Sequence, residues 1–148
     1  MIIDVLNYPD SRPTNHSVIR CANPDFEQEL SDILEKCGNK IAFSELYKQR
    51  LKYLEESRNN CFLRRQWFEK LKHDTNQRLY SMKFKSGSIS KNIRILFICT
   101  TTRVILLCAF VENTKQKSYS KNIEIANKRI KQLINYHFIK EEDIICHT

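Results

Sequence analysis

Arg94 is the residue whose position most clearly suggests chemistry. It alternates with Leu96 and Ile98 along a predicted strand face that is otherwise apolar. A guanidinium there needs an anionic partner, because an unpaired buried charge is very costly. A phosphate would supply one through two parallel hydrogen bonds. The alternative is an arginine at the strand end that reaches solvent or pairs with a glutamate, and the sequence leaves both interpretations open.

Further candidates flank Arg94 in the sequence. Lys83 projects from the polar face of the preceding strand, where a lysine binds phosphate or, once desolvated, exchanges a proton. Tyr119 follows the last strand, and a tyrosine there either stacks on a base or assists proton transfer. Ordinary solvated side chains are the simpler interpretation. The other candidates on these segments are Lys85, Lys115, Lys117 and, in the first turn of the final helix, Lys121.

Charge is unevenly distributed along the 148-residue chain. Residues 78–134 hold 12 Lys and Arg against 2 Asp and Glu, a net charge of +10, whereas residues 1–77 hold 12 of each sign. A basic block beside a neutral one is typical of a surface that binds a polyanion, although a solvated face can have the same composition.

Length and composition favour one globular domain in the cytoplasm. No run approaches the roughly 20 apolar residues of a membrane span, and no signal peptide is visible. The cysteines form no Cys-x-x-Cys pair, so we do not expect a metal site. Their even number allows a disulfide framework, but a chain of this length without a secretory signal points to the cytosol and favours buried or incidental thiols. They lie at positions 21, 37, 61, 99, 108 and 146.

Apolar periodicity predicts the helices that position these residues. A first helix begins at Asn23-Pro24 and ends near Gly38, because Asn caps helices, Pro suits their first turn and Gly stops them. The other predicted helices span residues 42–58, residues 62–72 around Trp67, and residues 121–136 with Ser120 as N-cap.

The period changes to that of strands at Arg78. Residues 78–85 alternate between an apolar face with Tyr80, Met82 and Phe84 and a more polar face. Residues 93–99 and 103–111 are apolar on both faces and form a hairpin through a short threonine link. The order predicts an α+β fold with a mainly antiparallel central sheet, helices on one face and a C-terminal helix.

A family resemblance rests on four strings in this order and spacing: Arg78-Leu79-Tyr80-Ser81-Met82-Lys83-Phe84, Asn92-Ile93-Arg94-Ile95-Leu96-Phe97, Val104-Ile105-Leu106-Leu107-Cys108-Ala109-Phe110-Val111 and Ile123-Glu124-Ile125-Ala126-Asn127-Lys128-Arg129. Together they resemble the phage-derived branch of the HigB/RelE family of bacterial toxins. The resemblance covers residues 66–134 and, in pattern only, residues 16–65. It leaves residues 1–15 as an N-terminal extension and 137–148 as a tail of a single RelE-like domain, 1–148.

The resemblance implies the toxin of a toxin–antitoxin pair, a ribonuclease that cleaves mRNA on the ribosome without metal or organic cofactor. It also implies a helix-turn-helix antitoxin as partner and no membrane. Family members use Arg, Lys and Tyr for catalysis, which points to Arg94, Lys83, Lys117 and Tyr119 here. The expected RNA-binding residues are Lys85, Lys91, Arg103, Lys115, Lys121 and Lys128.

The chain departs from its family directly after the last strand. A lysine pair usually stands there, but this chain has Glu112 and Asn113. A glutamate at that position would repel phosphate, and Lys115 and Lys117 would have to replace the pair. The alternative is therefore a protein with weakened catalysis that keeps the RelE fold and binds RNA, the ribosome or a partner.

Overall fold

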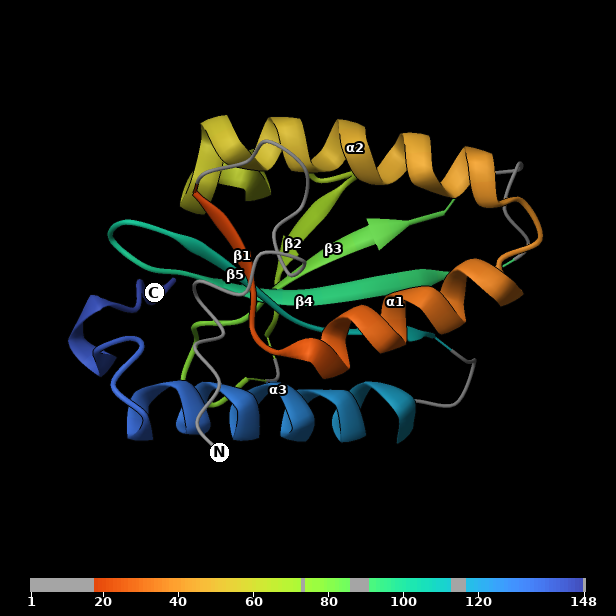
Figure 1. Cartoon of the computed structure of the whole chain (residues 1–148). Coiled ribbons are helices and arrows are strands. Elements are labelled where there is room, and N and C mark those ends of the chain that lie inside the picture. The colour runs from red at the N-terminus through yellow and green to blue at the C-terminus, as the bar shows by residue number, and fades with distance from the viewer. Residues whose placement is uncertain (1–17, 73, 86–90, 113–116, 148) are drawn as a thin grey trace.

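The protein is represented by a computed structural model that describes residues 18–72, 74–85, 91–112 and 117–147. Its elements form three layers, with α1 and α2 on one face of the sheet and α3 on the other. Figure 1 shows α2 above the sheet and α3 below it. The elements are β1 (Ile19–Cys21), α1 (Pro24–Lys36), α2 (Lys40–Ser57), the 3-10 helix η2 (Arg58–Leu63), β2 (Phe68–Lys70), β3 (Tyr80–Phe84), β4 (Ile93–Cys99), β5 (Val104–Val111), α3 (Lys117–Asn135) and the 3-10 helix η3 (Glu141–Asp143).

The five strands lie in the order β1-β5-β4-β3-β2. The pair β1–β5 is parallel and the other pairs are antiparallel, which confirms the predicted α+β fold and its hairpin of β4 and β5. Two apolar clusters cover the two faces. The cluster under α1 and α2 includes Phe26, Leu54 and Phe84, and the cluster under α3 includes Leu96 and Ile130. The C-terminal helix therefore occupies the face opposite the other two helices.

Side-chain caps explain where the first two helices begin. Asn23 Oδ1 accepts a hydrogen bond from Phe26 N at 3.1 Å, as the sequence predicts for α1. After α1, Gly38 has φ = 86°, a left-handed conformation that favours glycine. Asn39 caps α2 in the same way, and that helix begins at Lys40 rather than at residue 42.

Residues 62–72 do not form the predicted helix. The 3-10 helix η2 ends at Leu63, and Phe68 then pairs with Met82 across β2 and β3. Pairing with β3 overrides the local periodicity, because closely spaced aromatic residues suit a strand as well as a helix. The final helix also differs from the prediction. It begins at Lys117, so Ser120 lies inside its first turn and is not its N-cap.

The tail after α3 packs against the end of the sheet. Thr100 and Ile144 form an isolated antiparallel bridge, and Ile145 N donates to Cys99 O at 2.8 Å. The ring nitrogen Nε2 of His147 lies 2.7 Å from Leu79 O, while its ring contacts Tyr80 edge-on. The tail thus packs at the end of the sheet where the β4–β5 hairpin turns. The predicted N-terminal extension, 1–15, lies outside the described residues.

The cysteines are thiols, and five of them are buried while Cys146 is exposed. Desolvation raises the pKa of Cys61 to about 12, so that thiol stays protonated and unreactive. In the part of the chain that the structure describes, no helix combines the length and apolarity that a membrane crossing requires.

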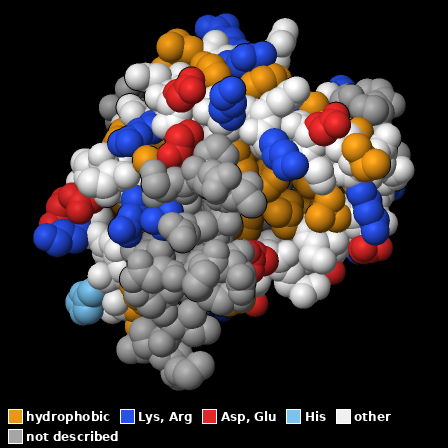
Figure 2. Space-filling view, turned by 45° about the horizontal axis from the view of Figure 1, so that its top comes forward, with side chains coloured by type: hydrophobic (Ala, Val, Ile, Leu, Met, Phe, Trp, Pro, Cys, Tyr) orange, Lys and Arg blue, Asp and Glu red, His pale blue; other side chains and the backbone are white. Residues whose placement is uncertain are grey.

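Figure 2 turns the α2 side forward and shows Lys and Arg side chains spread beside a gathering of apolar ones.

A β-bulge changes which face the end of β5 presents. The register runs from Phe97–Leu106 to Leu96–Cys108, so Leu107 is an extra residue without a partner on β4. Before the bulge, Leu106 packs under α1 and α2, whereas beyond it Cys108 and Phe110 pack under α3. Glu112, two residues after Phe110, is thereby directed to the α3 side.

The bulge also turns the carbonyl oxygen of Leu107 and the N–H group of Ala109 away from β4. They point to the side of β5 that β1 covers only as far as Leu106. An ion pair between α1 and α3 binds both of them. Glu29 Oε1 accepts from Ala109 N at 3.1 Å, and Arg129 Nη1 donates to Leu107 O at 2.7 Å. The two side chains bind each other at 2.6 Å. Burial lowers the pKa of Arg129, but the hydrogen bond and charge of Glu29 outweigh it and raise that pKa above its usual value. We call this pair the β5 clamp.

Removing either partner of the β5 clamp should destabilise the fold. We expect Glu29→Ala and Arg129→Leu each to lower the free energy of unfolding by about 2 kcal/mol, because each leaves a charge and a backbone group without partners. Urea unfolding measures this. The matched control is Glu35→Ala, which breaks an ion pair with Lys40 whose side chains are 69% and 60% exposed, and should cost less than about 0.5 kcal/mol. Equal losses in both pairs would contradict a structural role for the clamp.

Candidate functional site

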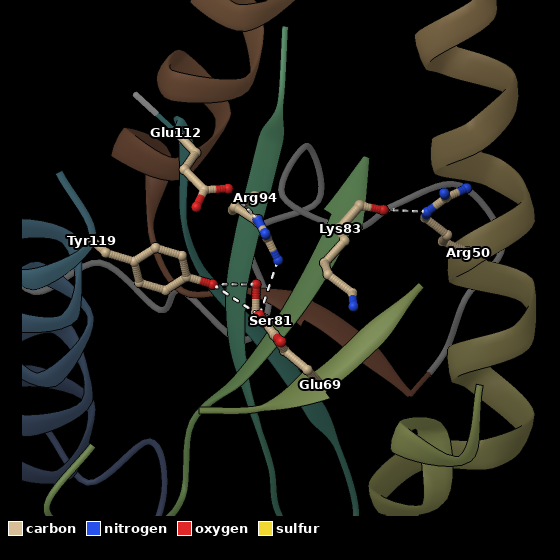
Figure 3. Close-up of polar contacts among 7 residues, drawn as sticks. All are labelled: Arg50, Glu69, Ser81, Lys83, Arg94, Glu112 and Tyr119. Atoms are coloured by element: carbon tan, nitrogen blue, oxygen red, sulfur yellow. Dashed lines mark hydrogen bonds and ion pairs between the residues drawn. The ribbon is translucent and has the colours of Figure 1, made fainter. Parts of the chain in front are cut away.

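The candidate site lies on the α3 side of the sheet, beside the start of α3. Strand register brings its members together, since Lys83 on β3 lies opposite Arg94 on β4 and Glu69 on β2 lies opposite Ser81 on β3. Tyr119 approaches from the first turn of α3, and Glu112 from the end of β5 (Figure 3). Four strands and one helix therefore contribute to one polar cluster.

Arg94 is held between two carboxylates. Its Nε donates to Glu112 Oε2 at 2.8 Å, and its Nη1 donates to Glu69 Oε1 at 2.9 Å. Of the partners that the sequence leaves open, the folded protein supplies glutamates. The side chain of Arg94 is 19% exposed, and no described residue hydrogen-bonds its Nη2. One edge of the guanidinium is thus available to an external acceptor.

Tyr119 forms the wall of the cluster. Its hydroxyl lies 3.0 Å from Ser81 Oγ and 3.3 Å from Glu69 Oε1, and the Arg94 guanidinium lies 5.7 Å from its ring centroid. Its ring packs edge-on against Phe110. Burial raises the pKa of Tyr119 to about 12, although the hydrogen bond to Ser81 and the charge of Arg94 oppose this rise. The hydroxyl therefore keeps its proton at neutral pH and can donate it.

Lys83 is the second cation of the cluster. Its backbone is fixed on both sides, since Lys83 N donates to Trp67 O and Arg50 Nε donates to Lys83 O, both at 2.7 Å. The side chain is half-buried, and Figure 3 shows its ammonium group among the labelled residues beside Arg94. These backbone hydrogen bonds fix the position on β3 from which the side chain of Lys83 extends.

The other predicted site residues are more scattered. Lys85 and Lys91 are exposed at the same end of the sheet, just outside β3 and β4. Arg103 lies at the opposite end, in the turn of the β4–β5 hairpin. Lys121 is exposed in the first part of α3, and Lys128 is also exposed but lies about 14 Å further along the helix than Tyr119. Lys115 and the side chain of Lys117 fall outside the described residues.

Two acidic members of the cluster were not predicted. Glu69 lay in the segment that was predicted to be a helix, so its face could not be assigned. The sequence alone shows Glu112 only as a departure that repels phosphate, whereas in the folded protein its carboxylate binds Arg94. The signal that points to both is Arg94 itself, because a guanidinium on an apolar strand requires acidic neighbours. In the described part of the chain, no three His, Cys, Asp or Glu side chains are grouped to hold a metal ion.

The α+β fold, with its mainly antiparallel sheet and α3 on the opposite face, is consistent with the RelE-like class. Residues 43–131 match the family model "Phage derived protein Gp49-like (DUF891)", and the chain belongs to that family. This is a HigB/RelE-like toxin family of toxin–antitoxin systems. No curated protein and no solved structure matches the chain significantly.

The energetic role of Arg94 can be tested by a double-mutant cycle with Glu112. Arg94→Leu should lower the free energy of unfolding by about 2 kcal/mol, because two partly buried carboxylates then face each other without their cation. Adding Glu112→Gln should restore about half of that loss by removing the repulsion. Urea unfolding at low salt measures the cycle. Additive effects of the two substitutions would show that the contact carries no stability.

The protonation of Tyr119 can be tested by absorbance. Its raised pKa means that the folded protein keeps this proton between about pH 10 and 12, where an unfolded tyrosine has lost it. Tyr119 thus contributes stability below pH 10 that is lost as the pH rises through about 12. In pH-jump mixing read before unfolding, wild type minus Tyr119→Phe should show phenolate formation near pH 12. The Tyr136→Phe variant serves as comparison, and formation near pH 10 would contradict the burial of Tyr119.

Proposed function

We propose that the protein is a metal-independent endoribonuclease and the toxin of a toxin–antitoxin pair. The observation that carries the proposal is one cluster that joins Arg94, Glu112 and Tyr119 next to Lys83. The resemblance to HigB/RelE toxins points to mRNA on the ribosome as the substrate. It also points to a small helix-turn-helix antitoxin as the partner that restrains the toxin.

RNA can be cleaved by attack of its own 2′-hydroxyl on the neighbouring phosphorus. In the proposed reaction Glu112 accepts the 2′-hydroxyl proton while the 2′-oxygen forms its bond to phosphorus. The bond between phosphorus and the 5′-oxygen then breaks, and Tyr119 supplies the proton for that leaving oxygen. The products are a 2′,3′-cyclic phosphate and a 5′-hydroxyl. The requirement for a 2′-hydroxyl restricts this reaction to RNA.

Glu112 is better suited than Glu69 to accept the proton. The same oxygen of Glu69 lies within hydrogen-bond distance of both Arg94 and Tyr119, so Glu69 orients these two groups. The carboxylate of Glu112 contacts Arg94 through Oε2 alone among the described residues, which leaves Oε1 for a substrate. The departure from the family's lysine pair thereby supplies a base.

The cations stabilise charge that develops during the reaction. Arg94 and Lys83 balance Glu69 and Glu112, so the four formal charges of the cluster sum to zero. A neutral site binds a ground-state phosphate weakly. The pentacoordinate phosphorus of the transition state carries more negative charge, and the guanidinium interacts with it more strongly, as catalysis requires. Substrate affinity must then come from contacts outside the cluster, such as those of a ribosome-bound mRNA.

A second candidate function is binding of RNA, the ribosome or a partner without cleavage. The observation that favours it is the pairing of Arg94 with two glutamates, which a phosphate must compete with. In that case Glu69 and Glu112 would serve the fold, and their substitution would change stability but no reaction. The two candidates therefore separate in one experiment on Glu112.

Glu112→Gln should preserve the site and remove its base. The amide oxygen can still accept the hydrogen bond from Arg94 Nε, but the side chain can no longer accept a proton. We expect cleavage of ribosome-bound mRNA to fall by about 100- to 10,000-fold, the usual contribution of a general base. The matched control is Glu124→Gln, an exposed glutamate on α3, which should cleave like wild type.

Growth provides a second readout of the same pair. Expression of the wild-type chain or of Glu124→Gln in a bacterium should arrest growth, whereas Glu112→Gln at the same soluble level should permit it. Melting temperatures within a few degrees of wild type exclude misfolding as the cause. If folded wild-type protein neither arrests growth nor cleaves mRNA, the ribonuclease proposal fails and the binding protein remains.

A further inference from the structure

A second group of cations surrounds Trp67, outside the candidate site. The guanidinium carbon of Arg64 lies 3.4 Å from the centre of the Trp67 ring, and that of Arg50 lies 4.7 Å from it. Arg64 also lies 5.4 Å from the centre of Tyr53. Arg64 is exposed, whereas Arg50 is buried. Trp67 therefore holds two guanidinium groups close together at the start of β2.

The segment around Trp67 is basic throughout. Residues 58–72 carry five Lys and Arg and a single acidic residue, Glu69, although the first 77 residues are neutral as a whole. Lys70 Nζ lies 3.9 Å from the centre of the Phe62 ring. Because β2 is the edge strand of the sheet, this segment borders solvent. We define the basic ledge as Arg64, Arg65, Trp67, Lys70 and Lys72.

Among the described residues, neither guanidinium at Trp67 forms an ion pair with a carboxylate. Arg50 instead donates to the carbonyl oxygens of Lys83 and Leu46, at 2.7 and 3.4 Å. Burial, and then the charge of Arg64, lowers the pKa of Arg50 to about 10. Two cations kept close without an anion between them create a positive potential that an incoming anion would relieve. The aromatic faces hold the guanidinium planes in place and compensate part of the repulsion.

A backbone hydrogen bond at the edge of the sheet connects the ledge with the candidate site. Trp67 O accepts from Lys83 N, so the residue that carries the stacked arginines also fixes the strand of the second site cation. Glu69 follows Trp67 by two residues, a rise of about 7 Å along a strand. The ring of Trp67 packs on the face under α1 and α2, whereas Arg94 lies on the α3 face, so one extended ligand contacts both by crossing the exposed edge at β2.

We propose that the basic ledge binds the phosphate backbone of single-stranded RNA beside the nucleotide that is cleaved. Arg64, oriented by Trp67, contacts a phosphate in a bidentate manner, and Arg65, Lys70 and Lys72 add charge along the same edge. This inference rests on the proposed ribonuclease function and names where substrate affinity arises. An acidic protein segment is the competing ligand. RNA fits better because an exposed guanidinium stacked on an aromatic ring is suited to both bases and phosphates.

The experiment measures binding without cleavage. A short fluorescein-labelled 2′-O-methyl RNA, which cannot attack its own phosphate, is titrated with the full chain at several salt concentrations by anisotropy. Arg64→Ala should weaken binding about tenfold and reduce the log–log salt slope by about 0.7, the value for one lost phosphate contact on a single strand. Arg64→Lys should keep the slope but not the affinity, because an ammonium keeps the charge and loses the planar stack. The control is Lys36→Ala, an exposed lysine at the end of α1 that should bind like wild type.

The outcomes separate the ledge from the catalytic proposal. If Arg64→Ala binds this RNA like Lys36→Ala, the ledge is not an RNA site. If RNA binding is unchanged but a polyglutamate peptide loses affinity for Arg64→Ala, the ledge takes an acidic protein and the proposal is overturned. Weaker RNA binding by Arg64→Ala supports the ledge even if wild-type protein cleaves no RNA, because the 2′-O-methyl RNA reports binding alone.

Discussion

The β-bulge at Leu107 is the constraint on which the rest of the molecule depends. One extra residue in β5 shifts the alternation of its side chains, so that Glu112 reaches the face where Arg94 lies. The same shift directs the backbone of β5 toward the edge, where Glu29 and Arg129 bind it. Without the bulge, Glu112 would face α1 and α2, and Arg94 would lose a carboxylate. Bulges commonly redirect side chains next to active sites.

The cluster around Arg94 also illustrates how the fold satisfies a charge on an apolar strand. Glu69 and Glu112 neutralise the guanidinium and fix its plane, and Tyr119 covers it from α3. A site neutralised in this way has little affinity of its own for phosphate, which separates catalysis from binding. In our proposals the cluster around Arg94 stabilises the transition state, whereas the basic ledge and the ribosome position the RNA.

Much of the fold followed from local sequence. The caps at Asn23 and Gly38 set the limits of the first helix, and the alternation in residues 78–85 identified the face of β3 that packs under α1 and α2, although Leu79 and Ser81 on the other face are buried as well. The sequence could not show that Glu69 lies on an edge strand, because only pairing with β3 makes residues 68–70 a strand. Nor could it show the bulge. Because β5 is apolar on both faces, its sequence does not indicate which residues face which side of the sheet. The partners of Arg94 depended on both.

The central claim is that this cluster cleaves RNA through attack by the 2′-hydroxyl. The most direct measurement is mass spectrometry of the fragments of a ribosome-bound mRNA treated with wild-type protein. A second mRNA carries a single 2′-deoxy substitution at the cleaved nucleotide. Our account predicts fragments that end in a 2′,3′-cyclic phosphate and begin with a 5′-hydroxyl, and no cleavage of the substituted mRNA. Fragments that begin with a 5′-phosphate, or equal cleavage of both mRNAs, would contradict it.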